Sequence, residues 1–239
     1  MSSAQNTPSI ARSAVVVAVD GTSGSGKSST SRGVAARLSL RYLDTGAMYR
    51  AMTWWMLQHG VDVHDPAAVA ARVGEPEIVS GTDPEAPTIA LDGVDVSTEI
   101  RSEVVNAHVS PVSAVPEVRA RLLTLQRAVI EEALADGGIV VEGRDIGSVV
   151  WPEAQVKVYV TADPSARAAR RALEEGGSDA ASVQASLEAR DRIDSTREAS
   201  PLVRADGAVH LDTTPYTLEQ VIDQVVALVE SATSTARTP

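Results

Sequence analysis

The sequence predicts an α/β fold in which helices cover both faces of a parallel β-sheet. Three observations lead to this prediction. Apolar, β-branched runs at 15–20, 139–141 and 156–161 have the length of buried strands, and segments with helical spacing separate them. The connections between strands and helices are only a few residues long. The first strand leads directly into a glycine-rich loop and then into a helical pattern, an order typical of phosphate-binding α/β proteins.

The loop after the first strand has the spacing G-x-x-x-x-G-K-S of a P-loop. Glycines let backbone N–H groups approach phosphate oxygens, and the following helix adds partial positive charge at its N-terminus. Lys27 would bind the β- and γ-phosphates, and the Ser28 hydroxyl would bind Mg²⁺. The residues expected to bind the triphosphate are Gly21, Thr22, Ser23, Gly24, Ser25, Gly26, Lys27, Ser28 and Ser29.

A flexible turn rich in Gly and Ser is the simpler explanation of such a pattern. The context disfavours it, because a strand pattern precedes the loop and a helical pattern follows it. The chain has only two lysines, Lys27 and Lys157, although arginine is plentiful, so a lysine in this loop is not expected by chance. We therefore expect a P-loop nucleoside triphosphatase fold.

Composition excludes several other classes. The chain has 21 basic and 32 acidic residues, and its net charge of −11 argues against sequence-independent binding to nucleic acid. Cysteine is absent, which excludes disulfides and thiolate zinc sites. Residues 1–13 are polar, and no apolar run approaches the about 18 residues of a membrane span. We expect a cytoplasmic protein without membrane or nucleic-acid partners.

The first half of the chain continues with a strand at 42–44 and a helix that ends at Gly60. In that helix, apolar side chains at helical spacing predict a buried face that includes Met48, Met52, Trp55, Met56 and His59. Asp65-Pro66 supplies an N-cap and a first helical residue for a short helix to about Val73. Between Gly74 and Ser97 the proline and glycine content breaks helices, and Asp92-Gly93 predicts a type I′ hairpin between 88–91 and 94–96. This small β element suggests an inserted substrate domain.

In the second half, a long helix follows Pro116 and ends at Gly137-Gly138, before the strand at 139–141. After the strand at 156–161, Asp163-Pro164 begins a helix, and a second helix carries Arg190 to Arg197. A last strand at 208–211 precedes a helix that opens with the capping box Thr217-Leu218-Glu219-Gln220. Residues after about 230 are expected to fray.

Polar residues follow several of these strands: Lys27, Asp44, Thr45, Glu142, Arg144 and Asp145. Ligands of parallel sheets bind at the carboxyl ends of the strands, so these residues should meet in one cleft. Arginines flank the same positions and suit phosphate oxygens, although a single arginine can equally be a surface residue in a weak ion pair. Glu142 stands at a strand end where P-loop proteins often keep a carboxylate near the metal. The alternative interpretation is that Glu142 is a solvated carboxylate without a role at a metal. The four histidines lack metal-ligand spacing.

Four motifs in this order carry a resemblance to a known family. They are Gly21 to Ser28, L-D-T-G-A-M-Y-R at 43–50, E-G-R-D-I-G at 142–147 and R-D-R-I-D-S-T-R at 190–197, with S-P-L at 200–202. They are similar to the motifs of bacterial cytidylate kinases, which are nucleoside monophosphate (NMP) kinases of the P-loop class. The resemblance covers residues 14–230 as a single kinase domain.

This resemblance implies a five-stranded parallel sheet in a core at 14–73, 112–162 and 198–230. It further implies an NMP-binding insert with a small β element at about 74–111, and a helical lid at about 163–197, with flexible tails at 1–13 and 231–239.

The resemblance also implies a role for each matched residue. Lys27, Arg144, Arg167 and Arg171 would be catalytic, and the lid residue Arg170 would bind ATP. The metal would lie at Ser28 and Glu142. Residues expected to bind CMP are Thr45, Arg50, Ser110, Arg119, Arg144, Asp145, Arg190, Asp194 and Arg197. Among these, Asp145 can accept from the exocyclic amino group of cytosine, where uracil offers only a carbonyl.

The expected activity is ATP-dependent phosphorylation of CMP and dCMP by a monomer, with Mg²⁺ as cofactor. One alternative is another P-loop small-molecule kinase, with UMP or shikimate as acceptor. A second is a non-catalytic, nucleotide-dependent regulatory protein. A guanine-reading N-K-x-D motif is absent, and a switch protein would not need an arginine-rich acceptor site.

Overall fold

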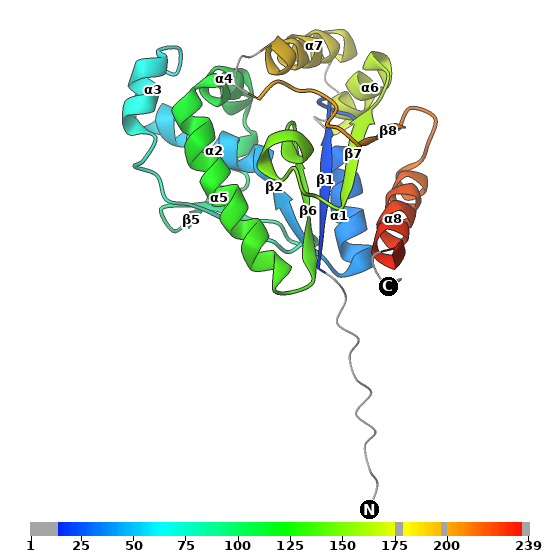
Figure 1. The fold of residues 1–239 in the computed structure, drawn as a ribbon. Coiled ribbons are helices and arrows are strands. Elements are labelled where there is room, and N and C mark those ends of the chain that lie inside the picture. The colour runs from blue at the N-terminus through cyan, green and yellow to red at the C-terminus, as the bar shows by residue number, and fades with distance from the viewer. Residues whose placement is uncertain (1–13, 175–178, 197–199, 236–239) are drawn as a thin grey trace, which may run out of the picture.

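A computed structural model describes residues 14–174, 179–196 and 200–235 and contains the predicted parallel sheet (Figure 1). Five strands pair in the order β2-β6-β1-β7-β8, and each neighbouring pair is parallel. The strands are β1 (Val15–Gly21), β2 (Arg41–Asp44), β6 (Gly138–Gly143), β7 (Val156–Thr161) and β8 (Val209–Asp212). The predicted α/β fold with a five-stranded parallel sheet is therefore confirmed.

Alternate side chains of the central strand β1 enter two different apolar cores. Val16 and Ala18 pack with residues of α2 (Thr45–Gln58) and α5 (Pro116–Leu134), while Val17 and Val19 pack with α1 (Lys27–Leu38) and α8 (Leu218–Thr235). This alternation follows from the two-residue period of a strand. Figure 1 shows α2 and α5 on one side of the sheet and α1 and α8 on the other. Both faces are covered, as expected of a parallel sheet.

The chain has no phenylalanine, and methionines supply large apolar side chains to the core around α2. Met48, Met52 and Met56 lie along one face of α2 and are almost fully buried, which confirms the predicted apolar face. His59 is an exception. Its ring is exposed and stacks on Trp55, with 3.8 Å between the ring centroids.

Local capping signals decide where two helices begin. The Asp65 carboxylate accepts from the backbone N–H groups of Ala67 and Ala68, at the start of α3 (Pro66–Arg72). At the start of α8, Thr217 Oγ1 accepts from the Gln220 N–H, and Gln220 Oε1 accepts from the Thr217 N–H. The predicted capping box is thus confirmed.

The C-terminal helix is longer than predicted. A tail was expected from residue 231, but α8 continues to Thr235. Packing explains the difference, because Val229 is buried in the second core and Ala232 packs against it. The Thr233 hydroxyl also donates to the Val229 carbonyl, 2.9 Å away.

The β element after α3 is a three-stranded antiparallel sheet. Strands β4 (Ile89–Leu91) and β5 (Val94–Asp95) form the predicted hairpin, with φ of 50° at Asp92 and 80° at Gly93. A third strand, β3 (Ile78–Ser80), pairs with β4 and was not predicted, because a strand of only three residues shows no readable alternation of apolar and polar side chains. A short 3₁₀ turn, η1 (Glu99–Arg101), then leads into α4 (Glu103–Ala114). The expected end of the insert at residue 111 lies inside α4, and the domain boundaries stay a prediction.

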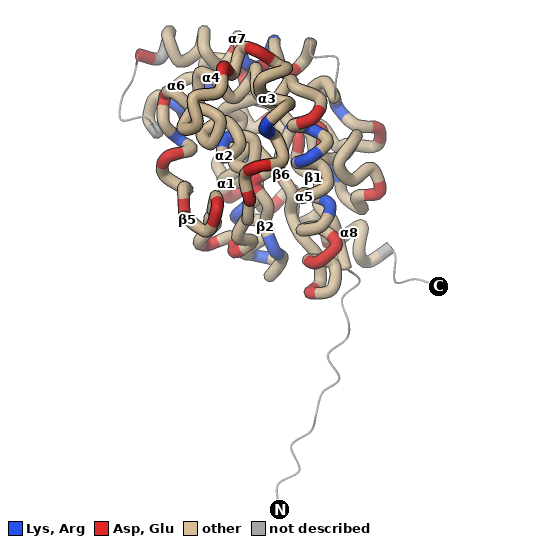
Figure 2. Tube along the Cα trace, turned by 90° about the vertical axis from the view of Figure 1, so that its left-hand side faces the viewer, with Lys and Arg blue, Asp and Glu red and all other residues tan. Residues whose placement is uncertain are grey.

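Two helices from the expected lid region lie near the carboxyl end of the sheet. They are α6 (Pro164–Glu174) and α7 (Ala180–Thr196), joined in a small apolar cluster by Ala168, Ala172 and Val183. Between β6 and β7 the chain forms a π-helix, η2 (Ile146–Val150), that the sequence did not predict. Within the described part of the chain, helices are either too short or too polar to cross a membrane. Acidic residues are spread over many elements of the molecule (Figure 2).

Candidate active site

A cavity of about 610 Å³ lies at the carboxyl edge of the sheet, between the P-loop, α4 and α7. Four of the six residues predicted to converge there line it: Lys27, Asp44, Glu142 and Arg144. The other two are buried. Thr45 donates its hydroxyl to the Glu142 carbonyl, 2.7 Å away, and Asp145 forms an ion pair with Arg119. The predicted cleft therefore exists, and these two residues support its wall.

The P-loop conformation depends on its glycines. A side chain on Gly21, whose φ is 146°, would place a Cβ atom 1.9 Å from the Val160 carbonyl oxygen. Gly24 and Gly26 also have positive φ, of 72° and 86°. The loop closes around the Thr22 carbonyl, which accepts from Lys27 Nζ at 2.6 Å and from Ser25 Oγ at 2.8 Å. The sequence G-x-x-x-x-G-K-S thus forms the cradle that its spacing predicted.

Positive charge is concentrated in the cavity. Burial lowers the pKa of Arg50 to about 9, with a further contribution from the charge of Arg190. Burial, and then the charge of Arg144, lowers the pKa of Arg190 to about 10. Burial and the Arg144 charge likewise lower the pKa of Lys27. Because these cations repel one another, a bound polyanion would relieve their repulsion, and guanidinium groups suit phosphate oxygens in particular.

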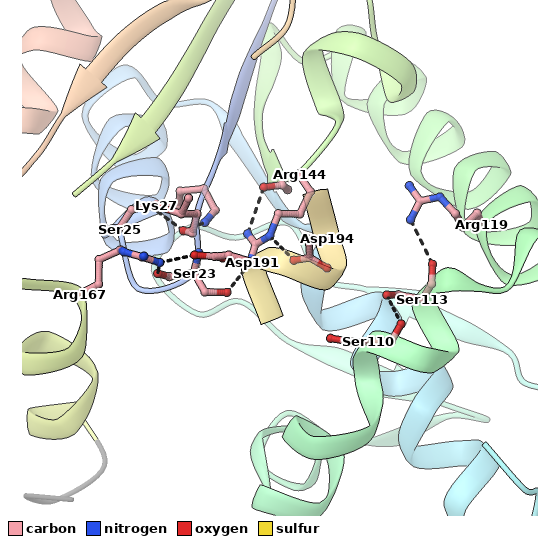
Figure 3. A network of polar contacts seen from close by, with 12 residues as sticks. Ser23, Ser25, Lys27, Ser110, Ser113, Arg119, Arg144, Arg167, Asp191 and Asp194 are labelled. Carbon is pink, nitrogen blue, oxygen red and sulfur yellow. Dashed lines mark hydrogen bonds and ion pairs between the residues drawn. The ribbon is translucent and has the colours of Figure 1, made fainter. Parts of the chain in front are cut away.

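Arg144 connects the P-loop to helix α7 (Figure 3). Its Nε atom donates to Asp194 Oδ2 at 2.9 Å, and its Nη2 atom donates to the Ser23 hydroxyl at 2.6 Å. Burial lowers the pKa of Arg144, but the charge and the hydrogen bond of Asp194 outweigh it, so the net direction is upward. Asp194, expected to contact a ribose, here orients Arg144.

The three expected lid arginines lie in different surroundings. Arg171 lines the cavity. Arg167 Nη1 donates to the Ser23 carbonyl at 3.0 Å and forms an ion pair with Asp191, which in turn accepts from the Ser23 N–H at 3.0 Å. Arg170 donates to the hydroxyl and the carbonyl of Thr213, each at 2.9 Å. Arg167 and Arg170 therefore bind other parts of the protein, and their expected contact with ATP phosphates stays a prediction.

A second polar cluster lies on the α4 and α5 side of the cavity. Arg119 and Asp145 form a buried ion pair, and Arg119 Nη1 also donates to the Ser113 carbonyl at 3.3 Å. Ser113 Oγ donates to the Ser110 carbonyl at 2.9 Å, and Ser110 lines the cavity (Figure 3). The structure thus brings together three residues that the sequence placed far apart, Ser110, Arg119 and Asp145. The remaining expected CMP-binding residue, Arg197, lies outside the described residues.

The carboxylate of Glu142 fits a role at a metal. Its Oε1 atom accepts from the Tyr42 hydroxyl at 2.6 Å, while Oε2 is buried with no hydrogen bond of 3.5 Å or less among the described residues. Burial raises the pKa of Glu142, as does the charge of Asp44, its register partner on β2. Lys27 opposes this rise in pKa, and the Ser28 side chain lies close enough to oppose it as well. A cluster of three or more His, Cys, Asp or Glu is absent from the described part of the chain. Mg²⁺ commonly takes one or two carboxylates and completes its shell with phosphates and water, so Glu142 and Ser28 suit it.

Sequence analysis missed three polar residues at the site. Asp191 binds both Arg167 and the Ser23 N–H. Asn106 accepts from Arg50, and Asp20 accepts from two backbone N–H groups after Asp145. Two of them gave a usable signal: Asp20 is the single charged residue in the apolar run before the P-loop, and Asp191 belongs to the motif at 190–197.

Known proteins resemble this chain along nearly its whole length. The model of the cytidylate kinase family matches residues 17–231. A cytidylate kinase of Streptomyces avermitilis is 58% identical over 217 residues, which cover 91% of this chain and 93% of that protein. The Streptomyces griseus cytidylate kinase is 59% identical over 220 residues, covering 92% and 94%, and the Nocardia farcinica cytidylate kinase is 52% identical over 225 residues, covering 92% and 96%.

Proposed function

The chain belongs to the cytidylate kinase family, and on this basis we propose that it transfers the γ-phosphoryl group of ATP to CMP and dCMP. The products are ADP and CDP or dCDP. The structural observation that supports the proposal is the cavity, which has the P-loop at one side, Ser110 at the other and Arg50, Arg144 and Arg190 in its lining. We further propose that the enzyme acts as a monomer in the cytoplasm, without membrane or nucleic-acid partners.

The donor side of the proposed site is the P-loop. Backbone N–H groups of the loop from Gly21 to Ser29 bind the phosphates of ATP, for which the Ser23 N–H must first leave Asp191. Lys27 exchanges its contact with the Thr22 carbonyl for a phosphate oxygen. Arg167, Arg170 and Arg171 add positive charge from the lid as the transferred group develops its charge. For Arg167 this requires release of Asp191 and of the Ser23 carbonyl.

The acceptor phosphate is proposed to bind Arg50, Arg144 and Arg190. These guanidinium groups come from α2, from the end of β6 and from α7, and their mutual repulsion favours an anion between them. A phosphate oxygen of the acceptor needs no general base, because it is already ionised at neutral pH. Catalysis then consists of positioning the two phosphates in line and stabilising charge.

Base recognition is proposed to rest on Asp145, Arg119 and Ser110, with support from Thr45 and Arg197. The Asp145 carboxylate accepts from the cytosine amino group, while uracil would present a carbonyl oxygen to it. Uracil would set a carbonyl oxygen against a buried carboxylate that, among the described residues, Arg119 alone neutralises, and this repulsion disfavours UMP. Asp194 binds the ribose hydroxyls and keeps Arg144 in place.

Mg²⁺ is the proposed cofactor, held by the Ser28 hydroxyl and the Glu142 carboxylate. When bound it would neutralise charge on the donor phosphates. Two observations support this assignment. Glu142 Oε2 is buried with no hydrogen bond of 3.5 Å or less among the described residues, and the Ser28 side chain lies close enough to oppose the rise that burial causes in the pKa of the Glu142 carboxyl.

An ADP-release assay with CMP, dCMP, UMP, AMP and shikimate as separate acceptors tests the proposal. We expect CMP and dCMP to give by far the largest kcat/KM. Fastest turnover with UMP or shikimate would favour another small-molecule kinase, and the absence of acceptor-dependent turnover would favour a regulatory nucleotide-binding protein.

A further inference from the structure

The residue proposed to recognise cytosine precedes an uncommon backbone segment. Asp145 lies immediately before the π-helix η2, and its own carbonyl accepts from the N–H groups of Val149 and Val150 at 2.9 and 3.1 Å. π-helical turns are rare, and they persist where surrounding contacts hold them. The position of the Asp145 carboxylate therefore depends on whatever fixes this segment.

Asp20 fixes the beginning of the segment. Its two carboxylate oxygens accept from the N–H groups of Ile146 and Gly147, each at 2.8 Å. The side chain is 3% exposed, and it lies at the end of β1, directly before the P-loop. Because both hydrogen bonds go to one ionised, buried carboxylate, they restrict the backbone at Ile146 and Gly147 more than a single bond between neutral groups would. Burial raises the pKa of Asp20, against the effect of these two donors.

Arg127 fixes the other end of the same segment. Its Nε and Nη2 atoms donate to the carbonyls of Val150 and Val149, each at 3.0 Å. Arg127 lies on α5, the helix that also carries Arg119, which forms the ion pair with Asp145. The segment from 145 to 150 is thus held from β1 at its start and from α5 at both ends.

We propose that Asp20 and Arg127 are positioning residues for base selection: they hold η2 so that the Asp145 carboxylate meets the base, and neither touches the substrate. This inference rests on the proposed function. It also links the two halves of the site, because Asp20 adjoins Gly21 of the donor loop and binds the backbone that follows Asp145.

Two variants test the proposal. Asp20→Asn keeps the size of the side chain but presents an NH₂ group to one of the two backbone donors, so one hydrogen bond is lost. Arg127→Ala removes both hydrogen bonds to the carbonyls at the end of η2. Because Arg127 is exposed, we expect this variant to fold even if Asp20→Asn does not. Glu131→Ala, at an exposed position of the same helix, is the matched control.

The readout is the ratio of kcat/KM for CMP to kcat/KM for UMP, with KM for CMP and for ATP measured separately. We expect Asp20→Asn to lower the ratio by about tenfold and Arg127→Ala by about threefold. KM for CMP should rise while KM for ATP changes by less than about twofold, and Glu131→Ala should match the wild type.

Folded variants with an unchanged ratio would overturn the inference, as would a parallel rise in KM for both substrates, which indicates a general structural role. Failure of the proposed function can be told apart from failure of this inference, because the wild-type enzyme itself would then show no preference for CMP over UMP.

Discussion

Asp145→Asn removes the negative charge from the most deeply buried ion pair at the site. The side chains of Arg119 and Asp145 are 9% and 7% exposed, so the Arg119 guanidinium would stay buried without its counter-charge. Breaking a buried pair from one side costs about 3–5 kcal/mol, and we expect that loss in the free energy of unfolding. Urea denaturation measures it. Glu132→Gln is the control, because it removes a carboxylate from an exposed pair with Arg41, where we expect a loss of about 1 kcal/mol or less.

The same variant should lose base selectivity. A hydrogen bond to a charged group contributes about 1.5–3 kcal/mol, so the preference for CMP over UMP in kcat/KM should fall roughly 10- to 100-fold. In the double variant with Arg119→Met, neither charge is left buried, and its loss of stability should be smaller than the sum of the two single losses. An Asp145→Asn enzyme that is as stable as the wild type and equally selective would refute the reasoning.

Three further predictions concern the donor loop, the buried carboxylate before it and the metal. Lys27→Ala should lower kcat by roughly 10³-fold or more with an unchanged circular dichroism spectrum, because the proposed role of Lys27 is to supply charge to the transferred group. Lys157→Ala should retain activity, and near-normal turnover of the Lys27 variant would contradict the P-loop assignment. Burial raises the pKa of Asp20 from 3.8 to about 6, so the folded state binds this proton more tightly than the unfolded state, and the contribution of Asp20 to stability rises as pH falls from 7 to 4. Relative to Asp20→Asn, the wild type should gain about 2 kcal/mol over that range in urea denaturation. A difference between the two proteins that does not vary with pH would disprove the shift. Glu142→Gln should raise the Mg²⁺ concentration for half-maximal rate by about tenfold, and an unchanged Mg²⁺ dependence would remove Glu142 from the metal site.

The parts of the fold that follow from local patterns could be read from the sequence. The strands at 15–20, 139–141 and 156–161, the Asp92-Gly93 turn and the capping box at Thr217 each depend on neighbouring residues alone. β3 and η2 could not be predicted in this way. β3 exists only through its pairing with β4, and the π-helix is held by side chains that lie far away in sequence.

The site likewise contains residues that local sequence could place and residues whose contacts depend on the folded protein. The rule that ligands bind at the carboxyl ends of strands correctly placed Lys27, Asp44, Glu142 and Arg144 at the cavity. It could not show that Asp145 turns toward Arg119, or that Arg167 is engaged by Asp191, since these choices depend on side-chain directions in the folded protein. Asp191 belongs to the motif at 190–197, but the motif alone gave no role for it, because its partners Arg167 and Ser23 lie far away in sequence.

The proposed function requires the cavity to hold a triphosphate donor and a cytidine monophosphate acceptor together. Transfer of label from [γ-³²P]ATP in the presence of CMP is the decisive measurement, with the products separated by chromatography. We predict that the label appears in CDP, that it does so only with CMP present, and that Lys27→Ala abolishes the transfer. Label recovered as inorganic phosphate at a rate that CMP does not change would rule out phosphoryl transfer to CMP.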